Sequence, residues 1–168
     1  MNKINKLCVF VALAGTTVLV QAQTTYPTRT VRLIVPSSPG GGTDISARIL
    51  APQLTQFLGQ QVIVENRPGA ATMIGGEAVV RAAPDGYTLG YVTTAWGGLV
   101  APLGTPRDII VKLNAEVNRA LQSSQLKERY AAIDAEAVGG TIAEFAEFVK
   151  KESVKWGEVV RKSGAKLD

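Results

Sequence analysis

The sequence predicts a single α/β domain with a mostly parallel β-sheet and flanking helices. Short β-branched runs alternate with runs of helical periodicity between Thr30 and Val92. Such alternation is typical of parallel strands joined by right-handed helical crossovers. The chain has 168 residues, of which 46% are apolar, and this supplies one hydrophobic core rather than two. In a sheet of this kind, a ligand crevice lies at the carboxyl ends of the strands.

The first strand and the helix after it are the most distinct elements. Thr30–Val35 is a β-branched apolar run that a proline stops, and a glycine-rich turn follows. We expect Thr43 or Asp44 to cap a helix that Gly59 ends. Its apolar residues, which fall at helical spacing, are Ile45, Ile49, Leu50, Leu54, Phe57 and Leu58. Pro52 should kink or restart this helix, because proline lacks a backbone donor.

Two more strands complete the predicted parallel core. Gln61–Glu65 is a second buried strand, Met73–Ala83 a short helix and Tyr87–Val92 a third strand. Gly97–Val100 is a brief extended segment. The sequence therefore predicts three parallel strands with short accessory strands beside them.

Helices dominate the second half of the chain. Thr105 and Pro106 supply a cap and a first-position proline for a helix that runs to about Gln122. This helix has the apolar spacing of one that lies on a sheet. A short helix over Leu126–Ala132 and a short extended piece over Glu136–Val138 follow.

The last predicted helix opens with a capping box formed by Thr141 and Glu144. Its apolar residues are Phe145, Phe148, Val149, Trp156, Val159 and Val160. We expect the rings of Trp96, Trp156 and Tyr87 to belong to the core, because each lies in a segment of apolar periodicity.

The amino terminus has the pattern of a secretory signal peptide over residues 1–22. Lys3 and Lys6 precede the apolar stretch Leu7–Val20, and cleavage is expected after Ala22. The alternative is a membrane anchor, but the apolar stretch is shorter than the ~20 residues that a spanning helix needs. Cys8 would leave with the signal, so the exported chain would have no disulfide. This pattern predicts a periplasmic protein of a Gram-negative bacterium.

Composition excludes several classes of function. The chain has no histidine and one cysteine, which removes Ser-His-Asp and Cys-His nucleophile systems and zinc sites built from these residues. No catalytic constellation emerges, and we expect neither a metal nor a cofactor. The formal net charge is +4 and aromatic residues make up 6% of the chain. Because the basic residues form no long run, a nucleic-acid surface is not predicted.

The glycine-rich segment Gly40–Asp44 has the position of an anion-binding loop. It lies between a strand and a helix, where unpaired N–H groups and the helix dipole favour a negative charge. It lacks the Gly-Lys-Ser/Thr of a phosphate-binding Walker loop, and Ile45 replaces the third glycine of a dinucleotide fingerprint. Glu65 resembles the ribose-binding acid of dinucleotide folds, but export argues against that function. The alternative for the loop is a tight turn in which Asp44 serves only the helix start.

An ordered set of motifs resembles the Bug family, the extracytoplasmic solute-binding receptors of tripartite tricarboxylate transporters. These motifs are Val31–Pro36, Gly40–Asp44, Ala47-Arg48, Leu58–Gln60, Val64–Ala70, Ile74-Gly75 and Ala83–Leu89, followed by Trp96–Leu99, Ala101-Pro102, Gly104–Pro106, Lys112–Asn114, Phe145 and Lys155-Trp156. The resemblance covers essentially all of Thr25 to Asp168.

The resemblance implies one lobe of a two-lobed fold of the type II periplasmic binding protein sort. Residues 23–168 would form a single α/β domain like the first lobe, with a deletion junction near residues 95–96 where the second lobe is missing. The ligand would be a small carboxylate: a di- or tricarboxylate, an acidic amino acid or an aromatic acid. Membrane permease subunits would be the protein partners. The ligand-binding residues that the resemblance implies are Ser38, Pro39, Gly40, Gly41, Gly42, Thr43, Asp44, Gly69, Ala70, Thr93 and Thr94.

Departures from the family pattern leave the ligand's identity open. Ser37 replaces a bulky residue, and Ala71–Met73 replaces a stretch richer in glycine and asparagine. Three functions therefore compete: a carboxylate receptor component impaired by loss of the second lobe, a folded remnant that binds no ligand, and a small exported α/β enzyme. Apolar surface near Trp96–Val100, once covered by the second lobe, would favour self-association.

Overall fold

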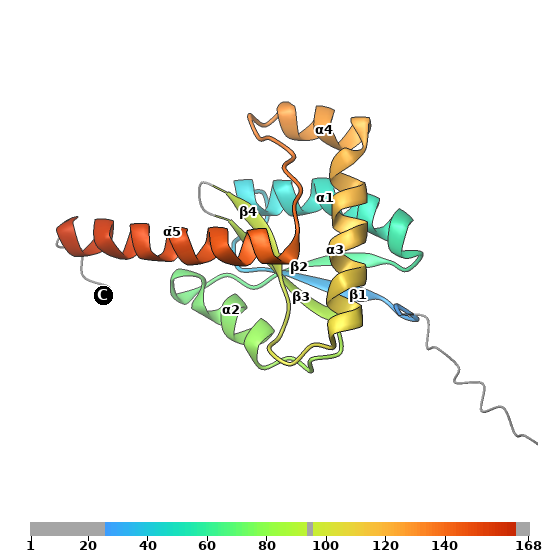
Figure 1. Ribbon diagram of the computed structural model, residues 1–168, viewed down its shortest axis with the longest axis horizontal. Coiled ribbons are helices and arrows are strands. Elements are labelled where there is room, and N and C mark those ends of the chain that lie inside the picture. Colours follow the sequence, from blue (N-terminus) through green and yellow to red (C-terminus); the bar gives the residue numbers. More distant parts are fainter. Residues whose placement is uncertain (1–25, 94–95, 164–168) are drawn as a thin grey trace, which may run out of the picture.

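The computed structural model describes residues 26–93 and 96–163 as an α/β domain (Figure 1). Its elements in chain order are β1 Val31–Val35, α1 Gly42–Leu58, β2 Val62–Asn66, the 3-10 turn η1 Ala70–Thr72, α2 Met73–Val80, β3 Thr88–Thr93, β4 Gly97–Val100, α3 Arg107–Gln122, α4 Ser124–Ala131 and α5 Ile142–Ser163. The predicted signal peptide lies outside the described residues, as do Thr94 and Ala95. No described helix is long and apolar enough to cross a membrane.

The four strands form one sheet in the order β2-β1-β3-β4. The first three are parallel, with Val31 opposite Val62 and Leu33 opposite Leu89. Strand β4 runs antiparallel to β3, and Thr93 pairs with Gly97. The prediction of an α/β fold with a three-stranded parallel core and an accessory strand is therefore confirmed.

The main core lies between one face of the sheet and helices α1, α3 and α4. Side chains of alternate strand residues, such as Leu33 and Leu89, face Leu50, Leu54 and Leu126, and all of these are buried. Helix α2 covers the other face, where Val79 packs on Gly90. Figure 1 shows α1 and α2 on opposite sides of the sheet.

Several predicted elements differ in detail. Helix α1 begins at Gly42, before the predicted caps Thr43 and Asp44, and it continues through Pro52 without restarting. The first hydrogen bond of α3 runs from Ile110 N to the Pro106 carbonyl, so Pro106 is the cap residue rather than the first helical residue. The Thr105 hydroxyl instead donates to the Pro102 carbonyl at 2.7 Å.

The carboxyl-terminal part shows a confirmation and two corrections. The capping box is confirmed: Thr141 N donates to Glu144 Oε2 at 2.7 Å, and Glu144 N donates to Thr141 Oγ1 at 3.1 Å. Residues 136–138 form no strand and pair with none of the four strands. The Trp156 ring was expected in the core, but the residue is 42% exposed because α5 extends past the sheet.

Candidate ligand-binding site

The candidate site lies at the carboxyl ends of three neighbouring parallel strands. The chain leaves β1 into the Ser37–Gly41 loop, leaves β2 into a loop that includes Gly69 and Ala70, and ends β3 at Thr93. Because β1 lies between β2 and β3, these segments are neighbours at one edge of the sheet. Of the predicted ligand residues, Ser38, Pro39, Gly40, Gly41, Gly42, Gly69 and Ala70 are exposed, Thr43 and Thr93 are half-buried, and Asp44 is buried. Thr94 lies outside the described residues.

The amino end of α1 is the chemically distinctive part of this edge. Gly41 is the cap residue, and no side chain caps the helix. The first intrahelical hydrogen bond runs from Ile45 N to the Gly41 carbonyl at 2.9 Å. The N–H groups of Gly42, Thr43 and Asp44 therefore precede that ladder, as in any helix start. Together with the dipole of a 17-residue helix they favour an anion.

Gly40 supplies the backbone shape that opens this helix end. Its φ is +81°, which is in the left-handed region that residues with a Cβ seldom adopt. No atom lies within 4 Å of where a Cβ would stand at Gly40 or at Gly42. A ligand oxygen can therefore approach the main chain directly.

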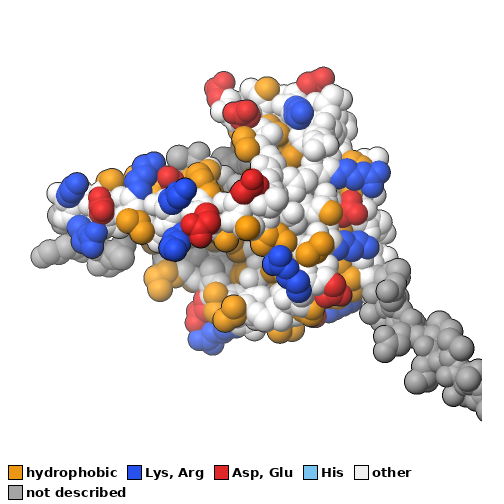
Figure 2. Space-filling view, viewed as in Figure 1, with side chains coloured by type: hydrophobic (Ala, Val, Ile, Leu, Met, Phe, Trp, Pro, Cys, Tyr) orange, Lys and Arg blue, Asp and Glu red, His pale blue; other side chains and the backbone are white. Residues whose placement is uncertain are grey.

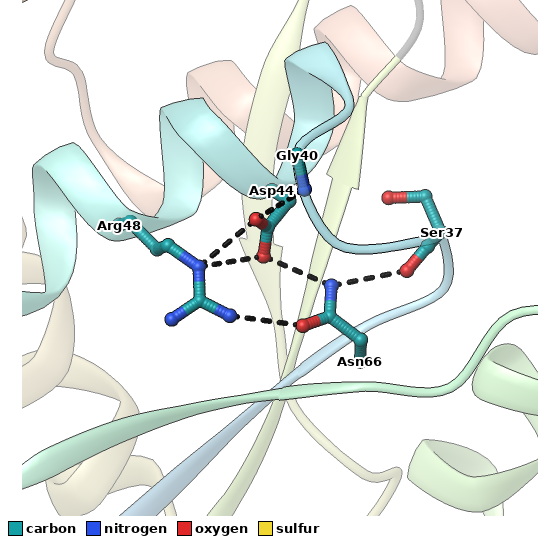
Figure 3. A network of polar contacts seen from close by, with 5 residues as sticks. All are labelled: Ser37, Gly40, Asp44, Arg48 and Asn66. Carbon is teal, nitrogen blue, oxygen red and sulfur yellow. Dashed lines mark hydrogen bonds and ion pairs between the residues drawn. The ribbon is translucent and has the colours of Figure 1, made fainter.

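Asp44 is held in a buried polar network beneath the loop (Figure 3). One of its oxygens accepts from Gly40 N at 2.8 Å, and the other accepts from the Asn66 amide at 2.9 Å. The Arg48 Nε lies 2.9 Å from both oxygens. The Arg48 hydrogen bond, with help from Gly40 and Asn66, lowers the pKa of Asp44 to about 2. Asp44 thus fixes the loop rather than facing a ligand, and Arg48 compensates its charge.

Asn66 joins the ends of β1 and β2 within the same network. Its Nδ2 group also donates to the Ser37 carbonyl at 3.0 Å, while its Oδ1 accepts from Arg48 Nη2 at 3.0 Å. The sequence reasoning missed both Asn66 and Arg48 as site-forming residues. The available signals were the place of Asn66 at the end of a predicted parallel strand and the i,i+4 spacing of Asp44 and Arg48.

Hydroxyl groups connect α1 to β3 and α4. The side chains of Thr43 and Thr93, both predicted, share a hydrogen bond of 2.5 Å. Deeper in the domain, Ser46 Oγ lies 2.5 Å from the Tyr91 hydroxyl, and the Tyr130 hydroxyl donates to the Ser46 carbonyl at 3.2 Å. Burial raises the pKa of Tyr130, so its phenol stays protonated and remains a donor. The amino end of α1 is therefore anchored to β3 on one side and to α4 on the other.

The second loop has an unusual backbone. Three successive residues have positive φ: Ala70 at 44°, Ala71 at 49° and Thr72 at 76°. This conformation is costly for residues with a Cβ, above all for a β-branched threonine. Gly75 then lets α2 approach the first loop, because a Cβ there would lie 2.6 Å from Pro36 Cβ.

The site is an open surface rather than an enclosed pocket. Two apolar hollows, of about 280 and 520 Å³, lie elsewhere: one between α2 and the sheet, the other among β4, α3 and the start of α5. Neither includes any residue from Ser38 to Asp44.

One polar atom near the loop has no partner in the described part of the chain. The buried Ser37 hydroxyl makes no hydrogen bond with the described residues.

Comparisons with known proteins identify a family and a fold. A profile described as "Tripartite tricarboxylate transporter family receptor" matches residues 46–95 and 90–165. Protein BugT of Bordetella pertussis is 51% identical over 81 residues, which are 48% of this chain and 24% of that protein. A UPF0065 protein of Bordetella bronchiseptica is 44% identical over 95 residues, 56% of this chain and 28% of the relative. Each match thus spans only about a quarter of the relative's length.

Solved structures share the fold at low sequence identity. The periplasmic binding protein BugD has a TM-score of 0.77 at 18% identity, over 83% of this chain and 99% of the other. MatC of Rhodopseudomonas palustris, solved with bound malate, has a TM-score of 0.75 at 18% identity, over 80% of this chain and 100% of the other. At this identity the likeness concerns the fold alone.

Proposed function

The chain belongs to the family of tripartite tricarboxylate transporter receptors, and on that basis we propose that it is a periplasmic receptor component that binds a small carboxylate. The observation that carries the proposal is the uncapped, glycine-lined amino end of α1 at the carboxyl edge of the parallel strands. Its N–H groups can donate hydrogen bonds to a carboxylate, the helix dipole favours a negative charge, and no described side chain blocks access of the ligand to the main chain. We propose no enzymatic role.

The ligand is proposed to be a di- or tricarboxylate, an acidic amino acid or an aromatic acid. The malate bound to MatC supports the first class. Within this domain, one carboxylate would lie on the Gly42 and Thr43 N–H groups, with Ser38, Pro39, Gly40 and Gly41 forming the rim. Gly69, Ala70 and Thr93 border the same edge, and Thr94 follows Thr93 in the sequence. Asp44 would act by holding the loop, because its oxygens already accept from Arg48, Asn66 and Gly40.

We propose that residues 23–168 form one lobe of a receptor and that a second-lobe segment is missing near residues 95–96. The family profile matches the chain in two segments that meet at residues 90–95, which supports a junction there. Thr93 pairs with Gly97 across the β3–β4 ladder, so only three residues connect strands that would otherwise lead to a second lobe and back. Permease subunits of the transporter remain the proposed protein partners.

One lobe should bind weakly. Small-ligand affinity depends on converging polar groups and on removal of water, and the loop surface here is open on one side. We expect a dissociation constant in the millimolar range or weaker, a binding free energy of about −4 kcal/mol or less in magnitude.

One observation favours a second candidate, a folded remnant that binds no ligand. The carboxylate of Asp44, in the first turn of the same helix, already accepts from Gly40 N, so a side chain of the protein occupies one donor of the loop. Self-association is a separate proposal. The apolar hollow of about 520 Å³ beside Trp96–Ala101 is open to solvent, and we propose that copies of the chain associate through it.

Calorimetric titration of the secreted chain with citrate, malate, glutamate and nicotinate tests the proposal. Gly42→Glu should abolish any binding, because the added carboxylate repels the ligand. The new side chain fits, since no atom of the described residues lies within 4 Å of a Cβ at this position. Gly76→Glu is the matched control, since Gly76 is also helical, exposed and unobstructed. Micromolar or tighter binding at a one-to-one ratio would show that this lobe suffices and is not impaired. Absence of binding to all four acids would favour the remnant.

A further inference from the structure

The second half of α5, from Lys150 onward, forms an arm that the domain leaves uncovered. Figure 1 shows α5 running across the sheet and extending beyond the other elements. None of its residues with a described side chain is buried. At 3.6 residues per turn, five of its large apolar residues fall in one stripe on the order of 100° wide, whereas the exposed Val154 lies on the opposite face. The residues of the stripe are Phe145, Phe148, Val149, Trp156 and Val159.

Only the first half of the stripe packs on the domain. The Phe145 ring covers Gly98, where a Cβ would lie 2.2 Å from the ring. The Trp96 ring meets Phe145 and Phe148 edge-on, at centroid distances of 5.9 and 5.2 Å. Beyond this contact, Trp156 is 42% exposed and Val159 47% exposed. The stripe therefore continues into solvent.

The same arm is strongly basic. Five Lys or Arg residues and two glutamates lie between Val149 and Lys162. Of the two glutamates, Glu152 already accepts from the Lys155 ammonium and from two indoles. Figure 2 shows Lys and Arg side chains gathered along α5. Two copies of the arm laid side by side would bring like charges together, which disfavours a second copy as its partner.

We propose that the α5 arm, residues Lys150–Lys162, binds an anionic lipid surface. A helix with an apolar stripe, a basic polar face and a tryptophan at the boundary has the chemistry of an interfacial helix. Trp156 and Val159 enter the headgroup region, and Lys151 and Lys162, which flank the stripe, contact anionic headgroups. The contact is weak and reversible, and it holds the receptor domain near the membrane. This inference does not depend on carboxylate binding.

Vesicle sedimentation tests the proposal with protein recovered from the periplasmic extract of expressing cells. Vesicles of equal parts phosphatidylglycerol and phosphatidylcholine should bind the chain, whereas vesicles of phosphatidylcholine alone should not. Binding should weaken as salt is added, because it is electrostatic. The double variant Lys151→Glu/Lys162→Glu should bind at least about tenfold less. The matched control Lys127→Glu/Arg129→Glu reverses two exposed charges on α4 and should bind like the parent.

A spectroscopic measurement places the contact at the arm. In a Trp96→Phe variant, Trp156 is the remaining tryptophan, and its emission should shift to the blue on mixed vesicles. Equal binding to both vesicle types would overturn the proposal. So would an α4 control variant that loses as much vesicle binding as the Lys151→Glu/Lys162→Glu variant. A dimer that forms without vesicles and dissociates when Lys151 and Lys162 are reversed would assign the arm to a second copy instead.

Discussion

The indole of Trp96 donates to the Glu152 carboxylate at 3.2 Å and so joins the start of β4 to the middle of α5. The Trp156 indole donates to the same oxygen at 2.9 Å, from the next turn of α5. The two tryptophans of the chain therefore share one acceptor. This contact lies where the packed half of α5 gives way to the exposed arm, so it sets how far α5 is attached.

Glu152→Ala should detach α5 beyond Phe148 while the parallel sheet stays folded. The substitution removes the shared acceptor, and hydrogen–deuterium exchange should rise in residues 149–163 but not in β1. Hydrogen bonds from Lys155 and Trp156 hold the pKa of Glu152 below its usual value. A group with a lowered folded pKa stabilises above its unfolded pKa, so in the parent the same detachment should begin as pH falls below about 4.3, the unfolded value of a glutamate. Glu147→Ala, on the opposite face of α5, is the control.

Asp44→Asn should destabilise the domain by about 2 kcal/mol at neutral pH, because it leaves Arg48 without its buried partner. The pKa of Asp44 is lowered to about 2, below the unfolded value of about 4. Its contribution is therefore present above pH 4 and lost as pH falls toward 2.

Urea unfolding at pH 7 and pH 3 measures this effect. The parent should lose more stability on acidification than Asp44→Asn does. Asp108→Asn, an exposed aspartate in the first turn of α3, should change stability little. An equal acid response in parent and Asp44→Asn would contradict the network as the origin of the effect.

Thr72→Gly should stabilise the domain by about 1 kcal/mol. Thr72 has a φ of 76°, which glycine adopts without strain and a β-branched residue does not. Thermal unfolding of the variant checks this, with Ala132→Gly as the contrast, since Ala132 has an ordinary φ of −65°. A lower melting temperature for Thr72→Gly would show that the loop gains from the threonine side chain.

The sequence predicted the elements that hydrophobic periodicity controls. Strands β1 to β3 and helices α1 and α3 appear within a few residues of their expected bounds, because their buried faces follow simple spacing. Hydrophobic periodicity does not predict whether the apolar face of a helix packs against the rest of the domain. The Trp156 stripe has the same spacing as a core helix, yet it projects into solvent.

The candidate site was predicted in position but not in its internal roles. The Gly40–Asp44 loop stands where the strand–helix pattern placed it. Asp44 faces inward because Arg48 and Asn66 converge on it from another turn and another strand. Such a contact depends on the distance between β1 and β2, which no local pattern contains.

Secretion is expected to yield a chain that begins at Gln23. Lys3, Lys6 and the apolar stretch before Ala22 are the signal for export. Mass spectrometry of the periplasmic protein should show this amino terminus. Intact Met1 on protein in the soluble cytoplasm would contradict the prediction.

Gly75→Ala should separate the two ligand loops and destabilise the domain by about 2 kcal/mol or more. A Cβ at Gly75 would lie 2.7 Å from Pro36 Cα and 2.8 Å from the Arg67 carbonyl. Both atoms are backbone atoms just beyond β1 and β2, so the clash is relieved only if α2 moves away from them. Gly76→Ala is the matched control, because its Cβ meets nothing within 4 Å and alanine favours a helix over glycine. Urea unfolding should therefore show opposite signs for these adjacent substitutions, and a Gly75→Ala variant as stable as the parent would mean that α2 does not fix the spacing of the loops.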